Sequence, residues 1–144
     1  MSLNFDKFFR PKSVCVIGAS STPGKPGNVV VRNIRDAGYP GKIFLVNPRG
    51  GKIGGHKVYK TIGELPEGID QAVVTLPASQ TPEVVCALGE KGIQAIVLAA
   101  SGFAEVDQMG ESLQEDLTVA IKKSGARVLG PNTTGHVSVP ASYT

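Results

Sequence analysis

The sequence lacks the features that mark membrane, secreted and nucleic-acid-binding proteins. No apolar run approaches the roughly 18 residues that a membrane-spanning helix needs, and residues 1–10 lack the apolar core of a signal peptide. Tryptophan is absent, and the formal net charge of +3 comes without a run of Lys and Arg interleaved with aromatic residues. We therefore expect neither a membrane nor a nucleic acid as a partner.

Cysteine and histidine are also scarce, with two of each among 144 residues. Cys15 and Cys86 lie within apolar stretches, so we predict buried free thiols, no disulfide bond and a reducing, cytoplasmic location. His56 and His136 have neither the spacing of metal ligands nor an evident catalytic partner, and we expect them at the surface or in turns. The sequence thus predicts no catalytic residue and no metal site.

The sequence does contain five short apolar runs rich in Val, Ile or Leu, without the alternation of a half-exposed strand. They are Val14–Ile17, Ile43–Val46, Ala72–Leu76, Ala95–Ala100 and Arg127–Leu129. Stretches with helical spacing separate most of them, namely Gly27–Ala37, Thr81–Lys91 and Met109–Lys123. This alternation predicts an α/β fold in one domain, residues 1–144. We expect a Rossmann-like three-layer arrangement, with a mainly parallel sheet of five to six strands and helices on both faces.

One segment departs from this alternation. Residues Arg49–Val58, between the second and third predicted strands, are rich in Gly and Lys. We expect an irregular excursion there, followed by a short helix near Ile62–Leu65.

Ligands of open parallel sheets bind beyond the carboxyl ends of the strands, so the loops that follow the strands are the place to expect a site. The loop after the first strand, Gly18–Gly27, is rich in Gly, Pro and hydroxyl groups. Its glycines let backbone amides approach an anion, and the following helix presents its positive end. It is neither a Walker A motif nor a complete G-x-G-x-x-G fingerprint, so by itself it predicts only a phosphate-bearing ligand. The candidate contacts are Gly18, Ser20, Ser21, Thr22 and Gly24.

The loop after the second strand narrows the choice of ligand. A site for NAD expects Asp or Glu at the end of that strand, to bind the ribose hydroxyls. Here the strand is followed by Asn47 and Pro48, with Arg49 and Lys52 close behind. All four are candidate ligand contacts. Two cations and no carboxylate favour a phosphate on the adenosine ribose, as in coenzyme A or NADP. The residues alone leave these two ligands open.

Motifs in the strand-end loops, together with one that precedes the first strand, carry a family resemblance. They are Phe9–Val14, Ile17–Ser20, Asn47–Gly51, Ser101–Glu105 and Leu129–Asn132. In this order they resemble the NDP-forming acyl-CoA synthetases, which include the α subunits of succinyl-CoA synthetase and of ADP-forming acetyl-CoA synthetase. The resemblance implies an N-terminal CoA-binding domain of Rossmann-like fold.

The resemblance also implies roles for individual residues. Ser20, Ser21 and Thr22 would line the phosphates of coenzyme A. Pro48, Arg49 and Lys52 would lie beside its 3′-phosphate, and the choice among Arg49, Lys52 and Lys25 stays open. The remaining implied contacts are Pro77 and Ala78 at the adenosine or pantetheine, and Ser101, Gly102 and Asn132 near the reactive end.

In the family, an acyl group passes through a phosphohistidine on a second domain, and a separate ATP-grasp module binds the nucleotide. Neither His56 nor His136 stands in the phosphohistidine context, and Thr133 takes the place of a Cys that many relatives have. We therefore expect this chain to bind coenzyme A as part of a longer acid–thiol ligase, without completing the reaction alone. The alternatives are an NADP-binding or redox-sensing Rossmann module, and a stand-alone CoA-binding protein without enzymatic activity.

Overall fold

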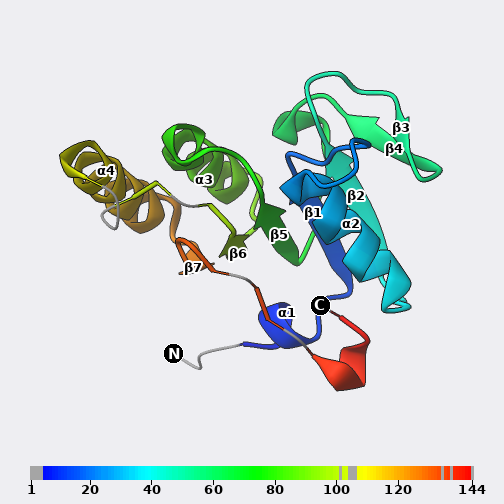
Figure 1. Cartoon of the computed structure of the whole chain (residues 1–144). Helices are drawn as coiled ribbons and strands as arrows, with labels where there is room; N and C mark the ends of the chain where they lie inside the picture. Colours follow the sequence, from blue (N-terminus) through cyan, green and yellow to red (C-terminus); the bar gives the residue numbers. More distant parts are fainter. Residues whose placement is uncertain (1–4, 101, 104–106, 134, 137, 144) are drawn as a thin grey trace.

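The computed structural model describes residues 5–100, 102–103, 107–133, 135–136 and 138–143. They form a seven-stranded sheet in the order β3-β4-β2-β1-β5-β6-β7 (Figure 1). The pairs are parallel except for β3 with β4, which is antiparallel. The predicted α/β class and mainly parallel sheet are confirmed, but the sheet has seven strands where five to six were expected.

The five predicted strands and three predicted helices are present, with bounds within two residues of those expected from the sequence. The strands are β1 Ser13–Ile17, β2 Lys42–Val46, β5 Gln71–Val74, β6 Ala95–Leu98 and β7 Arg127–Leu129. The helices are α2 Pro26–Asp36, α3 Thr81–Glu90 and α4 Gln108–Ser124. Every residue of β1, β5 and β6 is buried, which explains why these runs show no alternation of apolar and polar residues.

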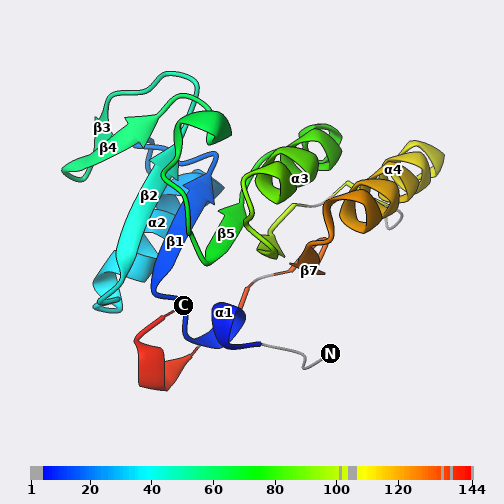
Figure 2. The ribbon, with the colours of Figure 1, turned by 180° about the vertical axis from the view of Figure 1, so that it is seen from behind.

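Helices cover both faces of the sheet, as predicted (Figures 1 and 2). Alternate residues of β1 point to opposite faces. Val14 and Val16 belong to the same core cluster as Ile34 of α2. Cys15 and Ile17 belong to a second cluster that holds residues of α3 and α4. The central strands are therefore buried between α2 on one side and α3 with α4 on the other.

The two additional strands come from the segment that was expected to be irregular. β3 spans Lys52–Ile53 and β4 spans His56–Tyr59, joined by a two-residue turn. Gly54 and Gly55 have φ of +55° and +83°, a combination that suits the twist of a tight hairpin. β4 then pairs in parallel with β2, with Val58 opposite Leu45. The expectation was wrong because strands of two and four residues show no clear period, and their position depends on β2.

The remaining elements are short. They are α1 Asp6–Phe9 and the 3₁₀ turns η1 Ile62–Glu64, η2 Ala78–Gln80 and η3 Val139–Ala141. After β7 the chain returns to the sheet beside α1, where the Tyr143 hydroxyl donates a hydrogen bond to Oε1 of the buried Gln71. No helix of the described residues is long and apolar enough to cross a membrane.

The two thiols lie in different environments. Both cysteines are free, as predicted. Cys15 is completely buried in β1, and burial raises the pKa of its thiol to about 12. Cys86 is only half-buried, beside a shallow pocket that Lys123 and Ser124 of α4 also line. The expectation of a buried Cys86 was therefore wrong, because α3 turns this position toward its flank with α4.

Candidate functional site

A cleft of about 380 Å³ opens at the carboxyl ends of β1 and β2, lined by the loops that follow them and by the β3–β4 hairpin. β2 and β5 lie on opposite sides of β1, so the cleft stands at the point where the strand order reverses. Its lining residues are Gly18, Ala19, Ser20, Ser21, Thr22, Lys25, Asn47, Pro48, Arg49, Gly50, Lys52, Ile53 and Leu76. The structure thus brings together the main predicted contacts from the first two loops.

The first loop leaves the sheet at Gly18, where only glycine fits. Its φ is +89°, and a Cβ there would lie 2.8 Å from Oγ1 of Thr75 and 3.0 Å from Cδ2 of Leu76. The Thr75 hydroxyl donates to the Ile17 oxygen at 3.0 Å, which fixes it in this position. Further along, Oγ of Ser20 accepts a hydrogen bond from the Thr22 amide at 3.0 Å. That bond closes the loop into a tight turn and leaves the Ser20 hydroxyl proton to donate.

Helix α2 begins at the cleft with its amino end uncapped. Lys25 is the N-cap and makes no side-chain capping bond, Pro26 follows, and the first turn contains no acidic residue. α4 differs, because the Asp107 side chain accepts a bond from the Gly110 amide there. The start of α2 packs tightly on the first loop, since a Cβ on Gly27 would lie 1.9 Å from the Gly18 oxygen. The positive end of a helix dipole is therefore held against the loop with no anionic side chain to neutralise it.

The turn after β2 is organised by Asn47. Its Nδ2 donates to the Ala19 oxygen at 2.8 Å, and its Oδ1 accepts from the Arg49 amide at 2.9 Å. The Gly50 amide donates to the Asn47 backbone oxygen at 2.9 Å, which completes a four-residue turn. Asn47 was predicted as a ligand contact, and the structure gives it a positioning role: it joins the two loops and presents Arg49.

Three cations line the cleft, and no carboxylate does. They are Lys25, Arg49 and Lys52, all exposed. Among the residues that the structure describes, none of the three has a carboxylate oxygen within 4 Å. Lys60 is a fourth cation, at the rim of the cleft, and the sequence did not predict it. Its side chain packs against Gly50, since a Cβ added to Gly50 would lie 3.0 Å from Cε of Lys60. No sequence signal placed Lys60 there, because the segment before it was expected to be irregular.

The cleft also has an apolar wall that the sequence did not predict. Ile53 comes from β3 of the hairpin, and Leu76 follows β5. Because Ile53 lay in the supposed excursion, nothing in the local pattern placed it beside the first loop. Together with Pro48 these side chains give the cleft a surface suited to a flat, weakly polar ring.

The other predicted contacts lie apart from this lining. Gly24 has φ +83° in the exposed part of the first loop, with open space around it. Pro77 is exposed before η2, whereas Ala78 is 7% exposed and belongs to the core. A Cβ on Gly102 would lie 3.5 Å from that of Ala78. Asn132 has φ 57°, and its amide donates to the Ala100 oxygen at 2.7 Å. Ser101 lies outside the described residues.

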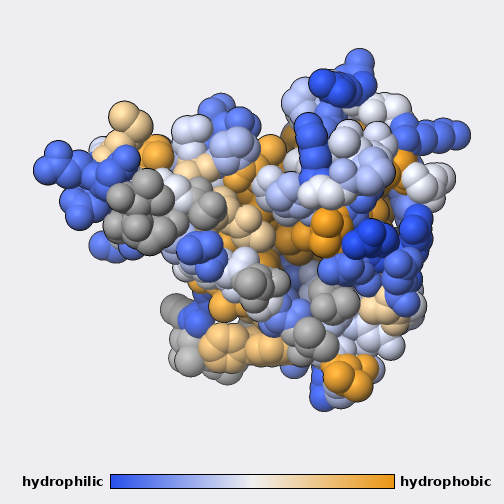
Figure 3. Space-filling view, viewed as in Figure 1, coloured by the Kyte–Doolittle hydropathy of each residue, from blue (hydrophilic) through white to orange (hydrophobic). Residues whose placement is uncertain are grey.

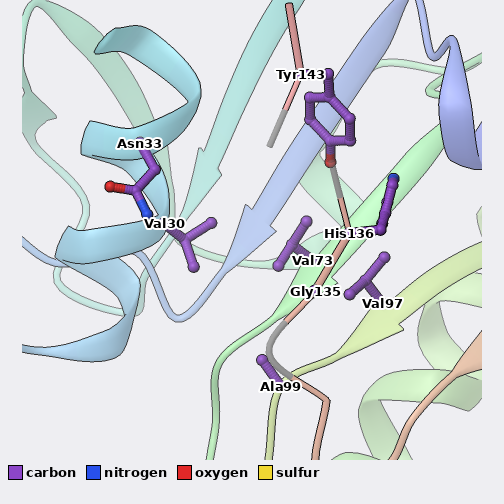
Figure 4. A pocket seen from close by; sticks show the side chains of 8 residues that line it. All are labelled: Val30, Asn33, Val73, Val97, Ala99, Gly135, His136 and Tyr143. Carbon is purple, nitrogen blue, oxygen red and sulfur yellow. The ribbon is translucent and has the colours of Figure 1, made fainter. Parts of the chain in front are cut away.

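A second, smaller cavity of about 80 Å³ lies under the C-terminal segment and beside α2 (Figure 4). His136 lines it, with Asn33 and Tyr143 among the other lining residues. Nε2 of His136 donates to the Phe8 oxygen, and its ring packs at 5.4 Å between centroids against Tyr143. His136 was expected at the surface or in a turn, but it is half-buried and lies outside any turn. Its Nδ1 is buried without a partner among the described residues.

His56 begins β4 opposite Ile53 and is also half-buried. Within the described ranges, no group of three or more His, Cys, Asp or Glu side chains could hold a metal ion. The cleft itself offers hydroxyls, amides and cations. This arrangement can bind and orient an anionic ligand, but it presents no nucleophile paired with a base.

Comparisons with known proteins agree with this geometry. A family model described as CoA binding domain matches residues 12–138. The chain is 41% identical over 143 residues to the acetate–CoA ligase (ADP-forming) I subunit alpha of Pyrococcus furiosus, covering 96% of this chain and 31% of that one. It is 44% identical over 127 residues to the acetate–CoA ligase (ADP-forming) II of Archaeoglobus fulgidus, covering 88% of this chain and 19% of that one.

A solved structure shares the fold closely. It is the apo form of the dinucleotide forming acetyl-coenzyme A synthetase 1 of Ca. Korarchaeum cryptofilum, with a TM-score of 0.91 and 34% identity, covering 97% of this chain and 30% of that chain. The chain thus spans less than a third of the length of each of these relatives. A Gly-rich loop, an uncapped helix and three cations meet in one cleft, and the family model matches residues 12–138. The chain therefore belongs to the CoA binding domain family.

Proposed function

We propose that the cleft binds coenzyme A through its phosphates, and that the chain acts as the CoA-binding part of an ADP-forming acyl-CoA synthetase. The observation that carries the proposal is the meeting of the uncapped α2 terminus with Lys25, Arg49 and Lys52 in a cleft without carboxylates. The relatives named as ADP-forming acetate–CoA ligases support the synthetase assignment. In such a reaction coenzyme A is a substrate, because its thiol takes the acyl group.

The parts of the ligand match different parts of the cleft. The diphosphate would meet the amides of the first loop and the amino end of α2, with Ser20 donating its hydroxyl proton. The ribose 3′-phosphate would lie at Arg49 and Lys52, since a phosphate monoester takes charge-assisted hydrogen bonds well. The adenine would pack on Ile53 and Leu76. Held at these points, the ligand would have its thiol end placed by the protein.

The acyl-transfer chemistry would come from other modules, a phosphohistidine domain and an ATP-grasp domain, as the family resemblance implies. The environment of His136 supports that division. Nε2 of His136 is bonded to the Phe8 oxygen and its Nδ1 is buried, so neither nitrogen is open to a phosphoryl group. A cytoplasmic location stays a prediction that rests on the cysteine content.

Isothermal titration calorimetry with coenzyme A, dephospho-coenzyme A, NADP and NAD tests the proposal. We expect coenzyme A to bind about tenfold or more tightly than dephospho-coenzyme A, because one charged hydrogen bond is worth about 1.5–3 kcal/mol. Lys52→Gln should lower the affinity for coenzyme A and leave that for dephospho-coenzyme A nearly unchanged. Lys122→Gln, at the far end of α4, is the matched control. Equal affinities for the two forms of coenzyme A would contradict the role of the cations, and tighter binding of NADP would favour the alternative module.

A further inference from the structure

The charges of this chain are divided between its two halves. Residues 1–60 contain eleven Lys and Arg but two Asp and Glu, whereas residues 61–144 contain four and ten. The fold converts most of this division into a separation in space. The exceptions are Glu64 and Asp70, whose carboxylates accept hydrogen bonds from backbone amides of the first half, those of Lys60 and Lys12. β3, β4, β2 and β1 come from the first half and lie at one end of the sheet with α2, while β5, β6 and β7 lie at the other with α3 and α4 (Figure 1). We call the first the basic end and the second the acidic end.

The two ends lie at opposite edges of the sheet. Seven strands at about 4.8 Å spacing span roughly 29 Å, which is about three Debye lengths at 0.1 M salt. Strongly hydrophilic side chains gather over both ends in Figure 3, over α4 on the left and over α2 and the hairpin on the right. The cleft is lined by three cations of the basic end and by no carboxylate, so the charges nearest to it are positive.

Several cations of the basic end do not line the cleft. Lys57 stands directly opposite Lys52 in the hairpin, so two like charges share one face of an edge ribbon. The Lys57 nitrogen lies 4.7 Å from the centre of the Tyr59 ring, which keeps it extended beside the hairpin. Arg32 is exposed on α2, about 9 Å along the helix from its first residue. Neither Arg32 nor Lys57 has a carboxylate oxygen within 4 Å among the described residues.

We propose that Arg32 and Lys57 speed the capture of the ligand without touching it, so that the basic end acts as an electrostatic funnel for a polyphosphorylated molecule. The inference rests on the proposed binding of coenzyme A, whose diphosphate and 3′-phosphate make it a polyanion. An unneutralised field of one sign around a cleft raises the association rate, and it does so without changing the contacts of the bound state. Because exposed charges are screened, the gain declines as salt is added.

The test measures association and dissociation rates by stopped flow, with a fluorescent derivative of coenzyme A that carries the free phosphates. For the double variant Arg32→Gln/Lys57→Gln, we expect the association rate to fall about three- to tenfold at about 10 mM salt. The difference from the parent chain should vanish near 300 mM, roughly the point where the screening length falls to about 6 Å. The dissociation rate should change by less than about twofold.

The control removes the same charge at the acidic end, by Lys122→Gln/Lys123→Gln in the last turn of α4. Its association rate should stay within about twofold of the parent, and an equal slowing would overturn the inference, because net charge and not position would be the cause. A faster dissociation rate with unchanged association would overturn it too, since Arg32 or Lys57 would then contact the ligand. If the unaltered chain fails to bind coenzyme A at all, the proposed function falls together with the inference. If the double variant binds coenzyme A with the affinity and rates of the parent chain, the electrostatic funnel is refuted and the proposed function stands.

Discussion

The side-chain nitrogen of Asn47 donates a hydrogen bond to the backbone oxygen of Ala19 across 2.8 Å, and so joins the loop after β2 to the loop after β1. Both loops line the cleft, one with hydroxyls and amides and the other with Arg49 and Pro48. Because Oδ1 of Asn47 also holds the Arg49 amide, one side chain sets the distance between the two halves of the site.

Replacing Asn47 by Ala should loosen both loops. The Ala19 oxygen and the Arg49 amide would lose their partners, so the free energy of unfolding should fall by about 1–3 kcal/mol. The affinity for coenzyme A should fall with it, since Arg49 would no longer be held. Urea unfolding and calorimetry measure the two effects. Asn33→Ala, at an exposed position of α2, is the control and should change stability by less than about 0.5 kcal/mol. Equal stability of both variants would contradict the role of Asn47 in linking the two loops.

Two glycines of the first loop region should respond differently to Ala. Gly24 has φ +83° and open space around it. Gly24→Ala should therefore lower the free energy of unfolding only by the cost of a left-handed backbone conformation for alanine, about 1–2 kcal/mol. Gly27 lies in α2, and its Cβ would collide with the Gly18 oxygen at 1.9 Å. No change of rotamer relieves a clash with backbone, so Gly27→Ala should cost about 3 kcal/mol or more and should abolish binding of coenzyme A. Denaturant unfolding of the two variants measures both costs. A Gly27→Ala variant more stable than Gly24→Ala would contradict the packing of α2 on this loop.

Alkaline pH should destabilise the fold through its buried tyrosines. Burial, with a smaller contribution from Asp70, raises the pKa of Tyr39 from 10.0 to about 12. The unfolded chain therefore releases this proton first, so the stability contributed by the neutral hydroxyl is complete below pH 10 and is lost as the pH rises toward about 12. The Tyr39 hydroxyl donates to the Pro11 oxygen at 2.7 Å.

Tyr39→Phe separates these effects. At neutral pH the variant should be less stable by about 1 kcal/mol, because it lacks the hydrogen bond to Pro11. Between pH 10 and 12 its stability should fall less steeply than that of the parent chain. Burial raises the pKa of Tyr143 and of the Cys15 thiol as well, so part of the slope should persist in Tyr39→Phe and a smaller part should remain when both tyrosines are replaced. Urea unfolding across this pH range gives the slopes, and an unchanged slope in the double variant would exclude the tyrosines as its source.

The apolar runs made the central strands predictable, and the helical spacing of apolar residues between them made the helices predictable. Each of these signals is local: a strand such as β6 is buried on both faces and is therefore apolar throughout. The β3–β4 hairpin was missed for the opposite reason. Lys52 and Ile53 alone form β3, and so short a run carries no period. His136 was placed wrongly because its partner, the Phe8 oxygen, lies 128 residues away in the sequence.

The sequence by itself determined the order of the five main strands and three main helices and the absence of a carboxylate after β2, and from these it predicted an anionic ligand. Those features depend on residue types and on neighbours in the sequence, so they can be read without the fold. Only the tertiary structure decided that Ile53 and Leu76 join the first loop at one cleft, that Lys60 lies beside Gly50 at its rim, and that Asn47 links the two loops. Pairing β4 with β2 and β5 with β1 brings these distant segments together, and that pairing is a property of the sheet as a whole.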